Sequence, residues 1–218
     1  MALSVDVFID IVCPWCFVGN QRLERVLAES GGPPAAVEHH AFLLDPTTPS
    51  EGRDIPTMLR RKYGIDPQEA WARLEAEARK SGLELDLSKQ RYNYPTVRAH
   101  TLIRRAHAKG TQRALVNDLF RAHFVEARNV NDPEVLADLG TRHGFTTDEV
   151  HALVNDAAEL AKTETDARAA AASGIQGVPF FVFAERLAVE GAQQEQVLRA
   201  AVERAAGLAE RDPQQRTG

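Results

Sequence analysis

The sequence predicts an α/β fold in which one domain is interrupted by a large all-helical insertion. Apolar and polar residues alternate in a strand-like manner near both ends of the 218-residue chain, whereas the middle shows helical periodicity punctuated by glycines. Neither strand-containing end is long enough to fold by itself, so we expect both ends to share one sheet. The length is that of one large domain or two small ones.

The first 50 residues are expected to contribute a strand, a helix and a second strand. Residues 5–12 alternate like a strand. Helical periodicity follows over residues 20–29, where Leu23, Val26 and Leu27 share one face. Residues 37–44 form the second strand, and this order predicts a parallel βαβ unit.

Residues 54–174 are expected to form the helical insertion. Several of its helices are preceded by capping residues, such as Asp132 and Thr146, and several are followed by glycines. Helical patterns occupy residues 56–63, 67–81, 96–109, 112–127, 132–143, 147–156 and 158–172.

Residues 175–207 are expected to complete the sheet domain. Residues 178–183 and 187–190 are predicted strands joined by a turn, and residues 193–206 are predicted to form an amphipathic helix. The remaining residues, 208–218, are expected to be a polar tail.

The two cysteines, Cys13 and Cys16, lie between the first predicted strand and the first predicted helix. Pro14 suits the first helical position, which places Cys13 at the N-cap beside unpaired backbone N–H groups that stabilise its thiolate. Cys16 follows one turn later and is expected to face the sheet, so we predict that Cys13 is the exposed nucleophile. The spacing allows a disulfide to form and reopen without remodelling of the backbone, as a redox pair requires.

Two other interpretations of this pair remain open at this point. The cysteines are also compatible with half of a zinc site that a second subunit completes, or with two unreactive buried thiols. The position between a strand and a helix favours the redox interpretation. The seven histidines include no local pair with ligand spacing, because adjacent residues such as His39 and His40 point to opposite faces of a strand, so we expect no metal site.

Composition and motifs exclude several classes of function. The net charge of −5 and pI near 5.8 provide no basic field for a phosphate backbone, so we expect no nucleic-acid partner. Charged residues interrupt every apolar run before it reaches the ~18–20 residues of a membrane span, and the start has no basic region of a signal peptide. We therefore expect no membrane partner and a cytoplasmic location. Glycine-rich phosphate-binding loops and the Gly-x-Ser-x-Gly motif are absent from the sequence.

Three segments carry a resemblance to a known family. The chain resembles the thioredoxin-fold DsbA-like oxidoreductases, specifically the cytoplasmic FrnE-like branch. The resemblance lies in Cys13-Pro14-Trp15-Cys16 after a strand, in Gly-Val-Pro-Phe-Phe-Val at residues 177–182, and in Gly-Ala-Gln at residues 191–193. The resemblance covers about residues 3–206 and implies a thioredoxin-like fold with the helical insertion.

The same resemblance implies the roles of individual residues. Cys13 and Cys16 would be catalytic, and the bond between Val178 and Pro179 would be cis and would lie beside them. A proline at this point leaves the preceding backbone free to bind an extended substrate, which supports that role. The substrate-binding residues implied in this way are Pro14, Trp15, Val178, Pro179, Thr96 and His100.

One segment departs from the family pattern. Where family members commonly have Asn-Thr-x-x-Ala-His, this chain has Pro95, Thr96 and, after two residues, Ala99 and His100. Any role of the missing amide is therefore in doubt, although the helix is still expected to cover the site.

The predicted activity is thiol–disulfide exchange with protein thiols and disulfides, or with small thiols such as glutathione. No cofactor is expected beyond the redox-active disulfide, with glutathione or a thioredoxin-type system as the electron partner. Two alternatives remain: a glutathione-dependent isomerase or transferase of the kappa-like type, in which a Ser usually replaces the first cysteine, and a non-enzymatic peptide-binding module with bridging zinc. The sequence leaves monomer and homodimer open.

Overall fold

The computed structural model of the chain describes residues 2–29 and 35–211, and a four-stranded sheet lies at its centre. The parallel pair β1 (Leu3–Ile9) and β2 (Ala35–Ala41) is extended by β5 (Phe180–Phe183) and β6 (Leu187–Glu190), both of which run antiparallel to their neighbours. The strand order is β2-β1-β5-β6, so the two ends of the chain share one sheet. This arrangement confirms the predicted thioredoxin-like α/β fold.

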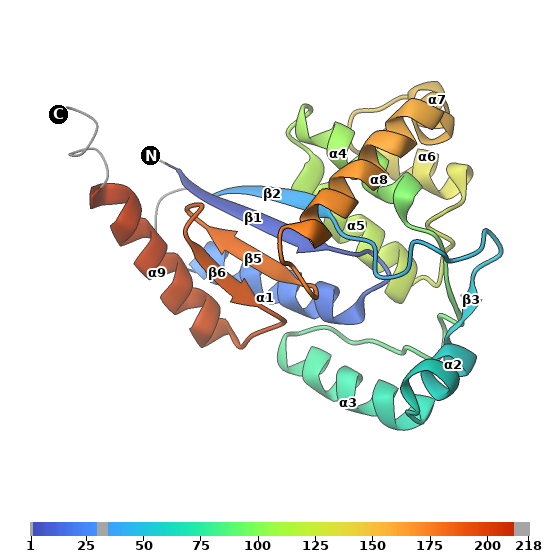
Figure 1. Cartoon of the computed structure of the whole chain (residues 1–218), viewed down its shortest axis with the longest axis horizontal. Helices are drawn as coiled ribbons and strands as arrows, with labels where there is room; N and C mark the ends of the chain where they lie inside the picture. Colours follow the sequence, from blue (N-terminus) through green and yellow to red (C-terminus); the bar gives the residue numbers. More distant parts are fainter. Residues whose placement is uncertain (1, 30–34, 212–218) are drawn as a thin grey trace.

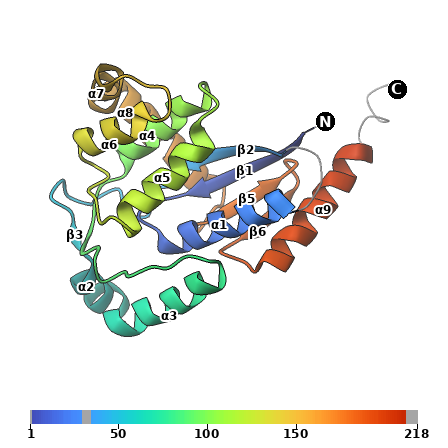
Figure 2. The same cartoon turned by 180° about the vertical axis from the view of Figure 1, so that it is seen from behind.

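Helices cover both faces of this sheet (Figures 1 and 2). Helices α1 (Pro14–Glu29) and α9 (Glu195–Arg211) pack on the face where Val5, Val7 and Phe181 are fully buried. Helix α8 (Ala157–Ala172) lies on the opposite face, where Ala170 belongs to an apolar cluster that contacts Phe8. The alternation of buried and half-buried residues along β1 follows directly from the strand period of two.

The helices of the insertion lie on two sides of α1 in both views (Figures 1 and 2). Below α1 in these views lie α2 (Ile55–Met58), a π-helical turn η1 (Leu59–Tyr63) and α3 (Pro67–Lys80). On the other side lie α8 and the helices α4 (Val97–His107), α5 (Gln112–Phe124), α6 (Pro133–Thr141) and α7 (Thr147–Asn155). No helix among the described residues is long and apolar enough to cross a membrane.

Short polar side chains start many of these helices. Asp66, Asp132 and Asp156 each accept a hydrogen bond from a backbone N–H in the first helical turn. Thr146 forms a reciprocal capping box with Glu149, as the Thr before two acidic residues indicated. These caps satisfy N–H groups that have no partner within the helix, so they define where the helices begin.

The strands differ from the predicted ranges. β1 ends at Ile9 rather than at residue 12, because the chain turns and the N–H of Cys13 donates to the carbonyl of Asp10 at 3.0 Å. β2 covers 35–41 rather than 37–44. β5 starts directly after Pro179 rather than at residue 178, since proline has no N–H for strand pairing.

Two further differences concern the insertion and the C-terminal segment. A two-stranded ribbon of β3 (Arg53–Asp54) and β4 (Tyr92–Asn93) was not predicted, because two-residue strands leave no period in the sequence. Helix α9 continues to Arg211, so the first residues of the expected polar tail are helical. The rest of that tail, residues 212–218, lies outside the described residues.

Candidate active site

The two cysteines lie at the start of α1, where the helix meets the end of β1. The carbonyl of Cys13 accepts hydrogen bonds from the N–H groups of Cys16 and Phe17 at 3.0 and 3.3 Å, which closes the first helical turn. Both cysteines are free thiols in this structure. Cys13 is 5% exposed and Cys16 is 0% exposed, so the more accessible thiol is the predicted one. Cys13 is nevertheless far more enclosed than a helix N-cap alone suggested, because other elements cover it.

The loop before β5 is one of these elements. The peptide bond between Val178 and Pro179 is cis, which confirms the prediction. The thiol of Cys13 donates to the carbonyl oxygen of Val178, with 3.7 Å between sulfur and oxygen. Residues 165 positions apart in the sequence therefore meet at the sulfur of Cys13.

The environment of Cys16 differs from that of Cys13. Burial raises the pKa of the Cys16 thiol well above its ordinary value, and a hydrogen bond with Cys13 raises the pKa further. Cys16 is therefore held as a neutral thiol behind Cys13. This arrangement separates an accessible sulfur from a protected one, as the two steps of disulfide exchange require.

A cavity of about 670 Å³ opens beside Cys13. Its walls come from the start of α1, from the loop before β5 and from the first helices of the insertion, and most of its lining is apolar. At its edge, three large apolar side chains are unusually exposed: Leu44 at 45%, Tyr63 at 53% and Ile65 at 44%. Such a concentration of exposed apolar surface around a hollow is typical of a binding site. The lining includes Cys13, Pro14, Trp15, Ile55, Met58, Leu59, Trp71, Leu74, Phe124, Gly177 and Val178.

The residues predicted to bind substrate fall into two groups. Pro14, Trp15 and Val178 line the cavity together with Cys13, and Pro179 is joined to Val178 in the same loop. Thr96 is 4% exposed and precedes α4, where it borders a smaller neighbouring hollow of about 60 Å³.

His100 lies deeper than a substrate contact requires. It is 1% exposed, and its Nε2 lies 3.5 Å from Oδ1 of Asp10 rather than in the wall of the cavity. Asp10 had no assigned role in the sequence, although it precedes Cys13 by three positions.

The walls contributed by the insertion were also not predicted as part of the site. Met58, Tyr63 and Trp71 belong to segments that the sequence identifies only as helical. The sequence feature that could have indicated a binding surface is the presence of these large apolar side chains in an otherwise polar stretch. The sequence could not show that this face is turned toward Cys13.

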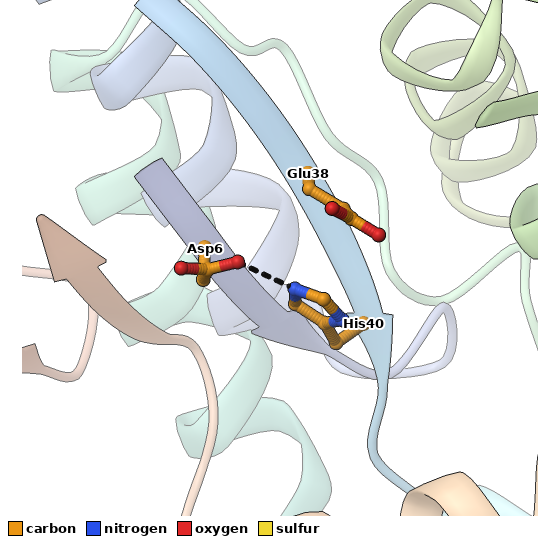
Figure 3. Close-up of side chains that lie close together, drawn as sticks. All are labelled: Asp6, Glu38 and His40. Carbon is orange, nitrogen blue, oxygen red and sulfur yellow. Dashed lines mark hydrogen bonds and ion pairs between the residues drawn. The ribbon is translucent and has the colours of Figure 1, made fainter. Parts of the chain in front are cut away.

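Another group of side chains lies on the face of the sheet opposite α1 (Figure 3). Asp6, Glu38 and His40 have potential metal-ligating atoms within 4.8 Å of one another. They come from neighbouring strands, which explains why local spacing did not reveal them. His40 forms a hydrogen bond with Asp6 at 2.8 Å and stacks on Phe8, so ordinary side-chain packing on a half-exposed surface accounts for this pair.

Comparison with known proteins agrees with the thioredoxin-like fold of this structure. The chain matches the family described as DSBA-like thioredoxin domain over residues 4–203. A crystal structure of a probable DsbA oxidoreductase from Streptomyces coelicolor is 35% identical, has a TM-score of 0.83, and is matched over 94% of this chain and 90% of that chain. A search of curated proteins gave no match.

More distant structures share the fold. A 2-hydroxychromene-2-carboxylate isomerase is 18% identical with a TM-score of 0.72, over 95% of this chain and 98% of that chain. A putative protein disulfide isomerase from Nitrosomonas europaea is 14% identical with a TM-score of 0.73, over 97% of this chain and all of that chain (100%).

Proposed function

Because the chain belongs to the family of DsbA-like thioredoxin domains, we propose that it exchanges disulfides with protein substrates through Cys13 and Cys16. The observation that carries this proposal is the position of the two sulfurs. Cys13 lines the apolar cavity, whereas Cys16 is fully buried one helical turn behind it. A substrate disulfide in the cavity reaches Cys13 and cannot reach Cys16.

The reaction then proceeds in two balanced steps. The Cys13 thiolate attacks one sulfur of a substrate disulfide, so a mixed disulfide forms and the other substrate sulfur leaves as a thiolate. Cys16 loses its proton and attacks Cys13, which closes the intramolecular disulfide and releases the second substrate thiolate. The substrate is reduced by two electrons and the dithiol is oxidised by two. Run in reverse, the same steps transfer a disulfide to a substrate dithiol.

The lining of the cavity supports a polypeptide with large apolar side chains beside its disulfide. Only Glu69 and Arg73 among the lining residues carry full charges, whereas glutathione carries several charged groups. Burial of an apolar side chain in such a site stabilises the complex by about 1.5–3 kcal/mol. Glutathione or a thioredoxin-type protein is then the electron partner that resets the dithiol. We also propose the cytoplasmic FrnE-like branch, on the basis of the Cys13-Pro14-Trp15-Cys16 motif and the segment around Pro179.

Trapping of mixed disulfides tests this function. Cys16→Ser protein should form a stable mixed disulfide with a disulfide-bonded peptide, because no second thiol resolves it. Cys13→Ser protein should form none. Equal trapping by the two variants would contradict the proposal.

Two measurements separate the alternatives that the sequence left open. Stoichiometric zinc in freshly purified protein, with thiols that react only after chelation, would indicate the peptide-binding module. The kappa-like activity would be indicated by two results together. Glutathione-dependent isomerisation would persist in Cys16→Ser protein, and the unsubstituted protein would show no disulfide exchange.

A further inference from the structure

A groove continues from the cavity beside Cys13 along the first helices of the insertion. It consists of three hollows of about 670, 60 and 240 Å³. Leu44, Met58 and Tyr63 line both the first and the second hollow, and Met58 and Lys62 line both the second and the third. Because neighbouring hollows share their walls, a polypeptide that binds at Cys13 can follow the groove as an extended chain.

The lining of this groove changes from apolar to charged along its length. The first hollow, which contains Cys13, is mostly apolar. Five of the seven residues that line the third hollow are charged: Asp45, Arg53, Asp54, Arg61 and Lys62. An occupant that fills the whole groove therefore needs an apolar part near Cys13 and a charged part farther along.

The two carboxylates of the third hollow already have cationic partners within the protein. Oδ2 of Asp45 lies 3.0 Å from Nε of Arg53, and the other oxygen of Asp45 accepts hydrogen bonds from Thr47. Oδ2 of Asp54 lies 2.8 Å from Nε of Arg91. Both acidic groups are thus paired, and neither needs a cation from a substrate.

Arg61 and Lys62 have no such partner. Both side chains are exposed on η1, and neither forms an ion pair with a carboxylate in residues 2–29 and 35–211. Lys62 lies over the ring of Tyr63, with its Nζ 5.4 Å from the ring centroid, and its charge acts on Asp45 at longer range. The ammonium group of Lys62 is therefore held beside the groove with its hydrogen-bond donors available.

The charge at this end of the groove is opposite to the net charge of the chain. Arg53 and Arg91 offset the two carboxylates, and Arg61 and Lys62 add two further positive charges. The whole chain carries a net charge of −5. Two uncompensated cations next to an apolar binding site attract an anionic group, and guanidinium and ammonium groups bind carboxylates through charge-assisted hydrogen bonds.

We propose that the protein prefers disulfide-bonded polypeptides with an acidic side chain a few residues from the cysteine that reacts with Cys13. This preference rests on the proposed function, because it concerns the same reaction at the same sulfur. The apolar residues beside the substrate cysteine occupy the first hollow, and a Glu or Asp farther along the substrate binds Arg61 and Lys62 in the third. Arg61 and Lys62 determine specificity and take no part in the exchange of sulfur bonds.

Pairs of peptides test this preference. Each peptide has leucine beside its single cysteine, which is joined to thionitrobenzoate as a mixed disulfide. One position about two to six residues from the cysteine, or roughly 7–20 Å along an extended chain, is Glu in one member of a pair and Gln in the other. Attack by Cys13 on the peptide sulfur releases thionitrobenzoate, whose absorbance gives the second-order rate constant.

We expect the Glu peptide to react about fivefold faster than its Gln counterpart for at least one position at low ionic strength. The ratio of the two rate constants should approach one at about 1 M salt, because exposed charges are then screened beyond ~3 Å.

Variants of the two cations locate the effect. Arg61→Gln should lower the ratio about twofold, and Arg61→Gln combined with Lys62→Gln should bring it to about one. Arg61→Glu combined with Lys62→Glu should reverse the preference, so that a Lys peptide reacts faster than the Glu peptide, which a mere loss of folding cannot produce. Arg204→Gln is the matched control, because Arg204 is exposed on α9 and lines none of the three hollows. It should leave the ratio unchanged.

The outcomes separate this preference from the proposed function. If the peptides react but the ratio is near one at every position, the preference is overturned and disulfide exchange stands. A preference for Glu that persists in the double Gln variant would also overturn it, because the acidic side chain would then bind elsewhere. If no peptide of any pair reacts with Cys13, the proposed function fails, and the preference fails with it.

Discussion

Gly19, on α1, lies against Pro179 so closely that a Cβ atom at position 19 would be 2.8 Å from Cγ of the proline ring. The same Cβ would be 3.3 Å from Cζ of Phe181. The helix that carries the two cysteines is thus packed directly on the loop that faces Cys13. The absence of a side chain at position 19 permits this approach.

Gly19→Ala should therefore reduce disulfide exchange even though alanine is the better helix former. The added methyl group pushes the loop away from α1, so the Val178 carbonyl moves relative to Cys13, and overpacking of this kind costs ~1–3 kcal/mol. We expect a fall of about tenfold in the exchange rate with a peptide disulfide. Gly207→Ala on α9 is the control, because its Cβ would meet no atom within 4 Å. An exchange rate for Gly19→Ala equal to that of the control would show that the contact does not position the loop.

The exposed apolar edge of the cavity should determine the choice of substrate. Tyr63→Ser removes part of this edge, so kcat/KM for a disulfide peptide with leucines beside its cysteine should fall about fivefold, or about 1 kcal/mol. A peptide with serines at the same positions should be little affected. Val197→Ser, at a residue 40% exposed on α9, is the control and should change neither value. Equal losses with both peptides would speak against an apolar specificity site.

Glu77 should contribute strongly to stability through Arg22, which is almost completely buried. The Arg22 guanidinium pairs with Oε1 of Glu77 at 2.5 Å and also donates to the Ala192 carbonyl at 2.7 Å, so it joins α1, α3 and the segment before α9. Glu77→Ala leaves this charge without its carboxylate, and we expect a loss of about 3 kcal/mol in the free energy of unfolding by urea. Lys80→Ala, which removes the exposed partner of the same carboxylate, should cost less than about 0.5 kcal/mol. Similar losses in the two variants would contradict this explanation.

Acidification should destabilise the protein through two buried histidines. Burial lowers the pKa of His39 to about 3 and that of His123 to about 4, from an ordinary value of 6.5. Below pH 6.5 the unfolded chain binds protons that the native protein does not. The free energy of unfolding is therefore unaffected by these two histidines above pH 6.5, and it decreases as the pH falls toward their lowered pKa values.

The slope of the free energy of unfolding against pH measures this effect. Each histidine contributes a slope of up to about 1.4 kcal/mol per pH unit. His123→Gln should reduce the slope between pH 6.5 and 5 by about half. His107→Gln, whose side chain in the native protein is 53% exposed, should leave it unchanged. A slope that is identical in all three proteins would show that His123 does not titrate on unfolding.

The sequence by itself determined the position of the cysteine pair and its immediate setting. A strand followed by Cys13, Pro14 and Cys16 at a helix start is a local pattern, and the chemistry of a helix N-terminus depends on residues that are neighbours in the chain. The proline at position 179 was likewise recognisable because it directly precedes an apolar strand.

The tertiary structure alone decided how enclosed Cys13 is, which side chains form the cavity and what lies behind Cys16. Trp71 reaches the site through the packing of α3 beside α1, and His100 meets Asp10 through the packing of α4. These contacts join residues tens of positions apart, and helical periodicity shows only that a face is apolar, not which surface it covers. The orientation of each inserted helix is set by long-range packing, so the sequence could predict which cysteine is the nucleophile, while only the fold could identify the surroundings of that cysteine.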